Sequence, residues 1–210
     1  MLKLYFLGGE NVFKRDAKEI NAAAFQDAGE SSAVVVFSWA RPSFDARYMR
    51  RKRVSEYFRS LGASSVCFPE FSDSFEEVAD KIAKSDLLYL TGGQVSALLS
   101  RLRKRGVDKL LLNYDGVIVG RSAGAMVLGK HCLVTNRYSR NRKVVYGLGL
   151  TNFSIKAHYE PSNDDLLKKL SKAGRIYAIP QRAALVYENG ALSFLGEVFQ
   201  FENGEKILAK

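Results

Sequence analysis

Ser122 has a glycine two residues before it and another two residues after it, Gly120 and Gly124. The segment follows the apolar run 116–119 and leads into small residues, which predicts a sharp turn from a buried strand into a helix. Only small neighbours fit such a turn, and the first N–H groups of the helix can donate to a developing oxyanion. The pattern therefore predicts Ser122 as the nucleophile of a serine hydrolase. The alternative is a glycine-rich turn in which the serine is incidental.

A serine nucleophile needs a base, and the chain has two histidines, His131 and His158. His131 follows Ser122 closely in sequence. It is expected near the far end of the short helix, which directs it away from the turn. His158 ends the apolar piece 153–157, which is interpreted as a strand whose end reaches the edge of the sheet where sites form. We expect His158 to be the general base and His131 to have a surface or capping role.

A second turn from strand to helix carries Gly92, Gly93 and Gln94 after the apolar run 87–90. Consecutive glycines let the backbone approach a ligand closely. The N–H groups of Gly93 and Ala123 can each donate to one oxyanion, so this turn is expected beside the substrate. Phosphate binding is the alternative, but neither of the two common glycine-rich nucleotide motifs is present.

The elements that must position these residues alternate between short apolar runs and stretches of helical spacing, as in a parallel sheet covered by helices on both faces. Strands are expected at 2–7, 33–38, 65–68, 87–90 and 116–119. Ser74 and Glu77 have the spacing of a capping box at the start of one intervening helix. The sequence predicts a mostly parallel central sheet in an α/β fold.

The pattern changes after residue 130, where strand-like pieces at 154–158 and 176–179 flank a helix at about 163–173. Asn-Gly pairs at 189–190 and 203–204 predict two antiparallel hairpins. There is no internal repeat, low-complexity segment or linker. Residues 1–210 are therefore interpreted as a single α/β domain.

The two cysteines, Cys67 and Cys132, lie in apolar runs without the spacing of a metal site. We expect both to be reduced core residues rather than ligands or a disulfide. No apolar run reaches the length of a membrane span, and the first residues have strand character rather than that of a signal peptide. We therefore expect a cytoplasmic protein, and the sequence leaves a homodimer open.

The net charge of +10 is concentrated in the segments 47–59, 101–105 and 137–143. Such a field attracts nucleic acids and acidic substrates alike. The simpler interpretation is a set of solvated helix faces and helix C-termini. No helix-turn-helix, RNA-recognition or zinc motif supports nucleic-acid binding.

Three segments together resemble the serine peptidase family of aspartyl dipeptidase (peptidase E) and cyanophycinase. The family's Gly-x-Ser-Ala-Gly-Ala elbow matches 120–125, its Gly-Gly-Gly-Asn is similar to 91–94, and its histidine after a short strand matches His158. The elbow motif is the specific part, and the order of segments agrees over most of the chain.

This resemblance implies a flavodoxin-like fold similar to class I glutamine amidotransferases, with no metal or cofactor. It implies Ser122 as nucleophile, His158 as base and the N–H groups of Gly93 and Ala123 as the oxyanion hole. Gly92, Gln94 and Arg137 are then substrate-binding residues, because the family uses the region after its nucleophile to hold the substrate. The loop 137–143 is accordingly expected to border the pocket and to favour acidic or C-terminally charged peptides.

The chain departs from the family at the third catalytic position. A glutamate in the family's stretch Gly-[Ile/Leu]-x-Glu corresponds to Gln181. A glutamine carbonyl can hold the tautomer of a histidine, but it cannot stabilise the imidazolium. Glu160, two residues after His158, is the alternative source of the charge.

Two substrate-binding positions of aspartyl dipeptidase also differ in this chain. An acid that follows the elbow in aspartyl dipeptidase aligns near Asn136 and Arg137, and an arginine after its histidine aligns near Asn163. Specificity for N-terminal aspartate is therefore not implied.

The leading hypothesis is a serine hydrolase of the peptidase E type that cleaves a small peptide or related amide. A second is a family member with little activity that serves as a small-ligand binding protein, because Gln181 leaves the triad incomplete. A third is a nucleic-acid-binding protein, suggested only by the basic segments.

Overall fold

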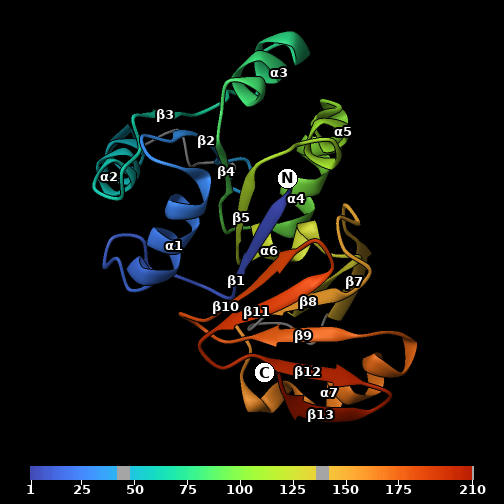
Figure 1. Cartoon of the computed structure of the whole chain (residues 1–210). Helices are drawn as coiled ribbons and strands as arrows, with labels where there is room; N and C mark the ends of the chain where they lie inside the picture. The colour runs from blue at the N-terminus through green and yellow to red at the C-terminus, as the bar shows by residue number, and fades with distance from the viewer. Residues whose placement is uncertain (42–47, 136–141, 210) are drawn as a thin grey trace.

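Short apolar runs form the strands of a central sheet. The computed structural model describes residues 1–41, 48–135 and 142–209 of the 210-residue chain. The strands of the larger sheet are β1 (Lys3–Leu7), β2 (Ala33–Phe37), β3 (Ser65–Cys67), β4 (Leu87–Leu90), β5 (Val117–Arg121), β10 (Ala184–Glu188) and β11 (Ala191–Leu195) (Figure 1). In the described residues its order is β11-β10-β1-β5-β4-β2-β3.

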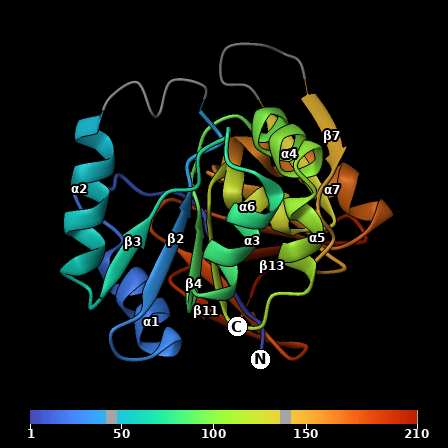
Figure 2. The same cartoon turned by 90° about the horizontal axis from the view of Figure 1, so that it is seen from above.

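The strands β1 to β5 of this sheet are parallel, and β10 and β11 extend it as an antiparallel hairpin beside β1. Helices cover both faces, as Figure 2 shows. One face carries α1 (Lys18–Ala28) and α2 (Tyr48–Arg59), and the other carries α3 (Phe75–Ala83), α4 (Val95–Lys104), α5 (Val107–Leu112) and α6 (Ala123–Leu128). The predicted α/β fold with a mostly parallel sheet is confirmed.

Side chains that alternate along each strand divide between the two cores. In β2, Val34 and Val36 pack toward α1 and α2, whereas Val35 and Phe37 pack toward α4 and α6. Because successive residues of a strand point to opposite faces, a strand that is covered on both sides must be apolar throughout. The capping box is also confirmed, since the Glu77 amide donates to the Ser74 hydroxyl and the Ser74 amide to the Glu77 carboxylate.

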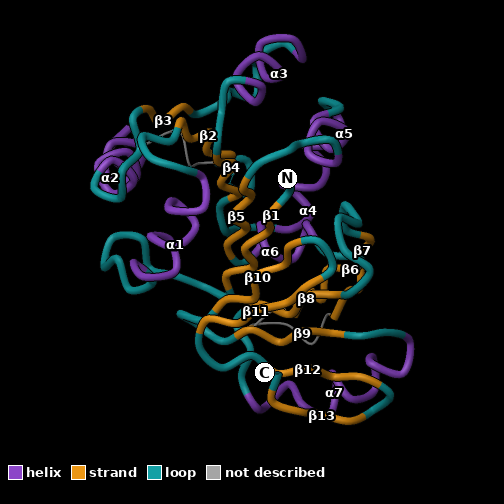
Figure 3. The backbone as a smooth tube through the Cα atoms, viewed as in Figure 1, coloured by secondary structure: helices purple, strands orange, loops and turns teal. Residues whose placement is uncertain are grey.

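A second sheet, which the sequence did not predict, forms from the later part of the chain (Figure 3). Its strands are β6 (His131–Thr135), β7 (Arg142–Tyr146), β8 (Ser154–Ala157), β9 (Ile176–Ile179), β12 (Phe199–Glu202) and β13 (Glu205–Leu208). Their order in the described residues is β13-β12-β9-β8-β6-β7. The two hairpins expected at Asn-Gly pairs are present as β10–β11 and β12–β13, and both residues of each pair have positive φ.

The strands β8 and β9, which precede these hairpins, are parallel to each other. A crossover with helical elements separates them, consisting of η1 (Pro161–Asn163), α7 (Asp164–Leu170) and η2 (Ser171–Ala173). Such a crossover returns the chain to the same end of the sheet, which makes the two strands parallel. The carboxyl end of β8, and thus His158, lies near the carboxyl end of β1, because the His158 N–H donates to the Gly8 carbonyl.

The helix after Ser122 is shorter than expected, and this corrects the placement of His131. The helix α6 ends at Leu128, Gly129 is extended, and His131 begins β6 with Nδ1 3.3 Å from the Ser154 hydroxyl. Both cysteines are free, Cys132 in the core and Cys67 only half-buried. Among the described helices, none is long and apolar enough to cross a membrane.

Candidate active site

Ser122 joins β5 to α6 in a conformation that few residues adopt. Its φ is 54° and its ψ is −108°, and its N–H donates to the Leu7 carbonyl at 2.9 Å. A side chain at Gly120 would bring Cβ within 2.6 Å of the Gly124 backbone, and one at Gly124 would bring Cβ within 2.2 Å of the Leu90 carbonyl oxygen. The two glycines are therefore required by backbone contacts, which hold the strained serine at the top of the sheet.

The Ser122 hydroxyl is in contact with the imidazole of His158. Oγ lies 2.7 Å from Nε2, a hydrogen-bond distance. His158 has a φ of 50° just after β8, and its N–H donates to the Gly8 carbonyl at 3.0 Å. Gly9 packs on the ring so closely that a Cβ there would lie 2.5 Å from Cε1 of His158. The loop 8–9 after β1 thus fixes the position of the imidazole.

The other ring nitrogen of His158 faces Gln181. The side-chain Nε2 of Gln181 lies 2.8 Å from Nδ1, whereas the sequence predicts the side-chain oxygen at this position. With the amide NH₂ donating to Nδ1, the ring proton is on Nε2, and this tautomer cannot accept a proton from Ser122. If the side-chain amide of Gln181 is flipped so that its oxygen and nitrogen exchange places, the oxygen faces Nδ1. The oxygen then accepts a hydrogen bond from Nδ1–H, and Nε2 is free to act as a base.

Glu160 lies at the start of η1, two residues beyond His158. Its side chain is exposed, and Glu160 is the N-cap of that short helical turn. The side chains described at the two imidazole nitrogens are those of Ser122 and Gln181. The arrangement therefore has the form of a Ser-His pair with an amide at the third position.

The turn Gly92-Gly93 borders Ser122, as expected, because β4 lies beside β5. A Cβ on Gly92 would lie 3.1 Å from Cβ of Ser122. Gly93 packs against the carbonyl of Ala40, and the Gln94 N–H donates to that carbonyl at 2.8 Å. Ala123 is the first residue of α6, so its N–H has no acceptor within the helix. Both proposed oxyanion donors thus lie in backbone segments beside Ser122.

A half-buried acid that the sequence did not single out, Glu10, lies close to this edge of the sheet. The Glu10 carboxylate accepts from Tyr89 Oη at 3.1 Å and from Asn21 Nδ2 at 2.9 Å. Burial raises the pKa of Tyr89 well above its usual value, and the charge of Glu10 adds to this shift. Tyr89 is therefore protonated at neutral pH and donates its hydroxyl hydrogen to Glu10. Glu10 follows Gly8 and Gly9, and only the register of β1 beside β5 indicates its proximity to the site.

Two arginines also lie at this edge without a sequence motif to indicate them. Arg41 Nε donates to the Gly92 carbonyl at 3.3 Å, and Arg121 Nη1 lies 3.5 Å from the Glu10 carbonyl oxygen. The pKa of Arg41 is lowered by loss of hydration and by the positive charges of Arg121 and Arg50. The side chains of Arg41 and Arg121 therefore both border the Gly92 turn.

Residues 136–141, which include Arg137, lie outside the described residues. The prediction that the loop 137–143 borders the pocket falls mostly on these residues and stays a prediction. Gln94 is the N-cap of α4, and its side chain forms no cap hydrogen bond. In the described ranges, no three His, Cys, Asp or Glu side chains are grouped as a metal site would require.

Solved structures of known proteins share the fold of this chain. A solved structure of a peptidase E candidate from Listeria monocytogenes EGD-e is similar with a TM-score of 0.71 and 21% identity, covering 93% of this chain and 98% of the other. A peptidase from an acI-B1 Actinobacterium gives a TM-score of 0.68 at 20% identity, with 99% and 96% covered. At these identities the likeness shows the fold, which is that of the peptidase E structures.

Curated relatives match a shorter part of the chain. An uncharacterised peptidase of Listeria monocytogenes is 27% identical over 127 residues, which are 54% of this chain and 62% of the relative. One of Listeria innocua is 28% identical over 120 residues, which are 53% of this chain and 56% of the relative. The chain thus matches little more than half the length of these relatives. Residues 23–195 match the model of peptidase family S51, and the chain belongs to this family.

Proposed function

We propose that this protein is a serine peptidase that cleaves a small peptide or related amide. The observation that carries the proposal is the 2.7 Å contact between Ser122 Oγ and His158 Nε2 at a strained elbow with glycines on both sides. Family S51 membership and the fold of the peptidase E structures support the same reaction class.

In the proposed reaction, Ser122 Oγ attacks the carbonyl carbon of the substrate while His158 Nε2 takes the hydroxyl proton. The carbonyl oxygen becomes an oxyanion, which accepts hydrogen bonds from the N–H groups of Gly93 and Ala123. His158 then gives its proton to the leaving amine, and the C–N bond breaks to leave an acyl ester on Ser122. Water hydrolyses the ester with the same base, which restores the hydroxyl.

Gln181 sets the expected rate of this reaction. An amide oxygen holds Nδ1–H and so selects the productive tautomer, but it carries no charge to stabilise the imidazolium that forms during attack. We therefore propose a peptidase that is slower than one with a carboxylate at this position. Gly92 and Gln94 border the substrate in this proposal, and Arg137 remains a predicted contact.

The experiment that tests the proposal is covalent labelling by an uncharged fluorophosphonate, followed by mass spectrometry of the labelled peptide. We expect labelling at Ser122 in the native protein and loss of labelling in Ser122→Ala and His158→Gln. His131→Gln is the matched control, because His131 lies in β6 against Ser154, and it should label like the native protein. Labelling that is absent from native protein, or that persists in Ser122→Ala, would contradict the proposal.

A second candidate function follows from the same Gln181 contact. A Ser-His pair without a charged partner can hold a small ligand at the oxyanion donors and turn it over slowly or not at all. Stabilisation of the protein by peptides that bind saturably, without hydrolysis products over long incubation, would favour this binding function. The expected cytoplasmic location and the homodimer stay predictions, which fractionation and sedimentation would test.

A further inference from the structure

Three consecutive backbone carbonyls at the end of β1 each accept an N–H group from a different segment of the site. The N–H of Ser122 donates to Leu7 at 2.9 Å, that of His158 to Gly8 at 3.0 Å and that of Arg182 to Gly9 at 2.9 Å. Arg182 directly follows Gln181 in the chain. The backbone of residues 7–9 therefore sets the spacing of the nucleophile, the base and the amide at the third position.

This backbone needs an anchor beyond its own residues. Gly8 and Gly9 have no side chains that could hold it, and glycine loses more conformational freedom on ordering than any other residue. The next residue, Glu10, supplies side-chain contacts on both of its carboxylate oxygens. Oε1 accepts from Asn21 Nδ2 at 2.9 Å, and Oε2 accepts from Tyr89 Oη at 3.1 Å.

The two partners of Glu10 are buried and belong to different elements. Tyr89 lies in β4, and Asn21 lies in α1. Asn21 Nδ2 also lies 3.1 Å from Tyr57 Oη, which belongs to α2. Burial raises the pKa of Tyr57, and the charge of Glu10 adds to this shift, as it does for Tyr89. Glu10 thus connects the loop after β1 to the central sheet and to the helices on one of its faces.

A positive charge accompanies this carboxylate. Arg121, the residue before Ser122, has Nη1 3.5 Å from the Glu10 carbonyl oxygen. The charges of Glu10 and Arg121 shift the pKa of Tyr89 in opposite directions, because one is negative and the other positive. The carboxylate is therefore held in place by hydrogen bonds and lies near a compensating cation, which favours one position for Glu10.

We propose that Glu10 is a positioning residue for the reaction, because its carboxylate holds residues 7–9 in the arrangement that brings Ser122 and His158 into contact. The inference rests on the proposed peptidase function. Glu10 acts through the backbone of residues 7–9 rather than on the substrate. A displacement of about 1 Å at a reacting centre can cost a hundredfold in rate, so loss of the anchor should affect the reactivity of Ser122 strongly.

The first test compares two substitutions of Glu10. Glu10→Ala removes both acceptors, and we expect kcat and the second-order rate of labelling by an uncharged fluorophosphonate to fall at least about tenfold. The loss should be in kcat rather than in KM, because Glu10 acts on Ser122 and His158. Glu10→Gln keeps an oxygen for Asn21, and the Tyr89 hydroxyl can accept from its NH₂, so this variant should recover part of the loss. A native labelling rate in Glu10→Ala would overturn the inference.

The second test removes the partner. Tyr89→Phe should lower the labelling rate less than Glu10→Ala, and the double variant should be no slower than Glu10→Ala, because the hydroxyl acts through the carboxylate. Tyr114→Phe is the matched control, since Tyr114 Oη donates to the Ser85 carbonyl at 2.9 Å beyond the amino ends of β4 and β5. It should label at the native rate. Independent, additive losses in the double variant, or an equal loss in the control, would contradict the proposed role.

Amide hydrogen exchange tests the anchor without relying on activity. The N–H groups of Ser122, His158 and Arg182 should lose protection at least about tenfold in Glu10→Ala, because their acceptors are the carbonyls of residues 7–9. The N–H of Val117, at the other end of β5, should keep its native protection. Native protein that is not labelled at Ser122 would contradict the proposed function, and the exchange of these three amides would still decide the inference. Native protection of all three in Glu10→Ala would overturn it.

Discussion

The side-chain amide of Gln181 lies 2.8 Å from Nδ1 of His158, on the opposite side of the imidazole from Ser122. A serine triad has a carboxylate at this position. The exchange of a carboxylate for an amide preserves the geometry of the site and removes its negative charge.

Gln181→Glu should raise kcat/KM at least about tenfold. A carboxylate next to Nδ1 stabilises the imidazolium that forms when Ser122 attacks, and about 1.4 kcal/mol of such stabilisation gives this factor. Gln181→Met, which is similar in size but accepts hydrogen bonds only weakly, should lower kcat/KM. Steady-state kinetics on one peptide checks both. A rate in Gln181→Glu equal to or below the native rate would mean that the charge is already supplied or is not used.

Glu160→Gln separates these two possibilities. Because Gln181 occupies Nδ1, we expect Glu160→Gln to lower kcat/KM less than Gln181→Met does. The measurement is the order of the two rates under the same conditions. The reverse order, with activity abolished in Glu160→Gln and little gain in Gln181→Glu, would identify Glu160 as the residue that completes the triad.

Gly9→Ala should damage activity more than stability. Its new Cβ would lie 2.2 Å from Oε1 of Gln181 and 2.5 Å from Cε1 of His158, which are side-chain atoms that can move away. We expect kcat/KM to fall at least tenfold, since small displacements at a reacting centre are costly, while Tm changes by no more than a few degrees. Native activity in this variant would show that the loop 8–9 does not position the imidazole.

Gly124→Ala provides the contrasting case. Its Cβ would lie 2.2 Å from the backbone oxygen of Leu90, which cannot move without distorting β4. We expect a loss of about 1–3 kcal/mol or more in the free energy of unfolding, measured by urea denaturation. A native stability would mean that the elbow has more room than this contact allows.

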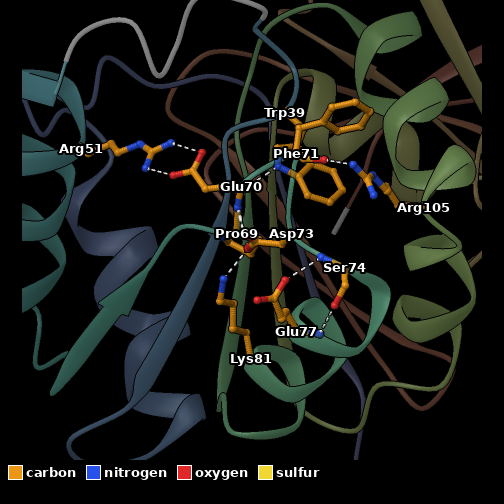
Figure 4. Close-up of polar contacts among 10 residues, drawn as sticks. All are labelled: Trp39, Arg51, Pro69, Glu70, Phe71, Asp73, Ser74, Glu77, Lys81 and Arg105. Carbon is orange, nitrogen blue, oxygen red and sulfur yellow. Dashed lines mark hydrogen bonds and ion pairs between the residues drawn. The ribbon is translucent and has the colours of Figure 1, made fainter.

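The ion pair of Arg51 with Glu70 predicts a small pH dependence of stability (Figure 4). The hydrogen bond from Arg51 lowers the pKa of Glu70 below its ordinary value of 4.5. The stabilisation that this ion pair gives the folded protein is therefore complete above the ordinary pKa of Glu70. It is lost as the pH falls through the lower pKa of Glu70 in the folded state. Glu70→Gln should cost at most about 1 kcal/mol at pH 7, because the pair is partly exposed. The difference from native protein should shrink below about pH 4 in denaturation experiments.

Local sequence patterns predicted the parts of this protein that depend on neighbouring residues. The glycines around Ser122 predicted the elbow because only glycine avoids the backbone contacts of that turn. Apolar runs predicted the parallel strands, and Asn-Gly pairs predicted the hairpins. The resemblance also led correctly to family S51.

Only the tertiary structure decided which distant residues meet. Three features depend on how strands far apart in sequence are ordered. They are the contact of the Gln181 amide with His158, the packing of Gly9 on the imidazole, and the second sheet. Arg41 and Arg121 are 80 positions apart and belong to no motif, so composition registered only an excess of positive charge. Periodicity fixes the conformation and buried face of each strand, but the order of strands follows from the packing of the whole chain.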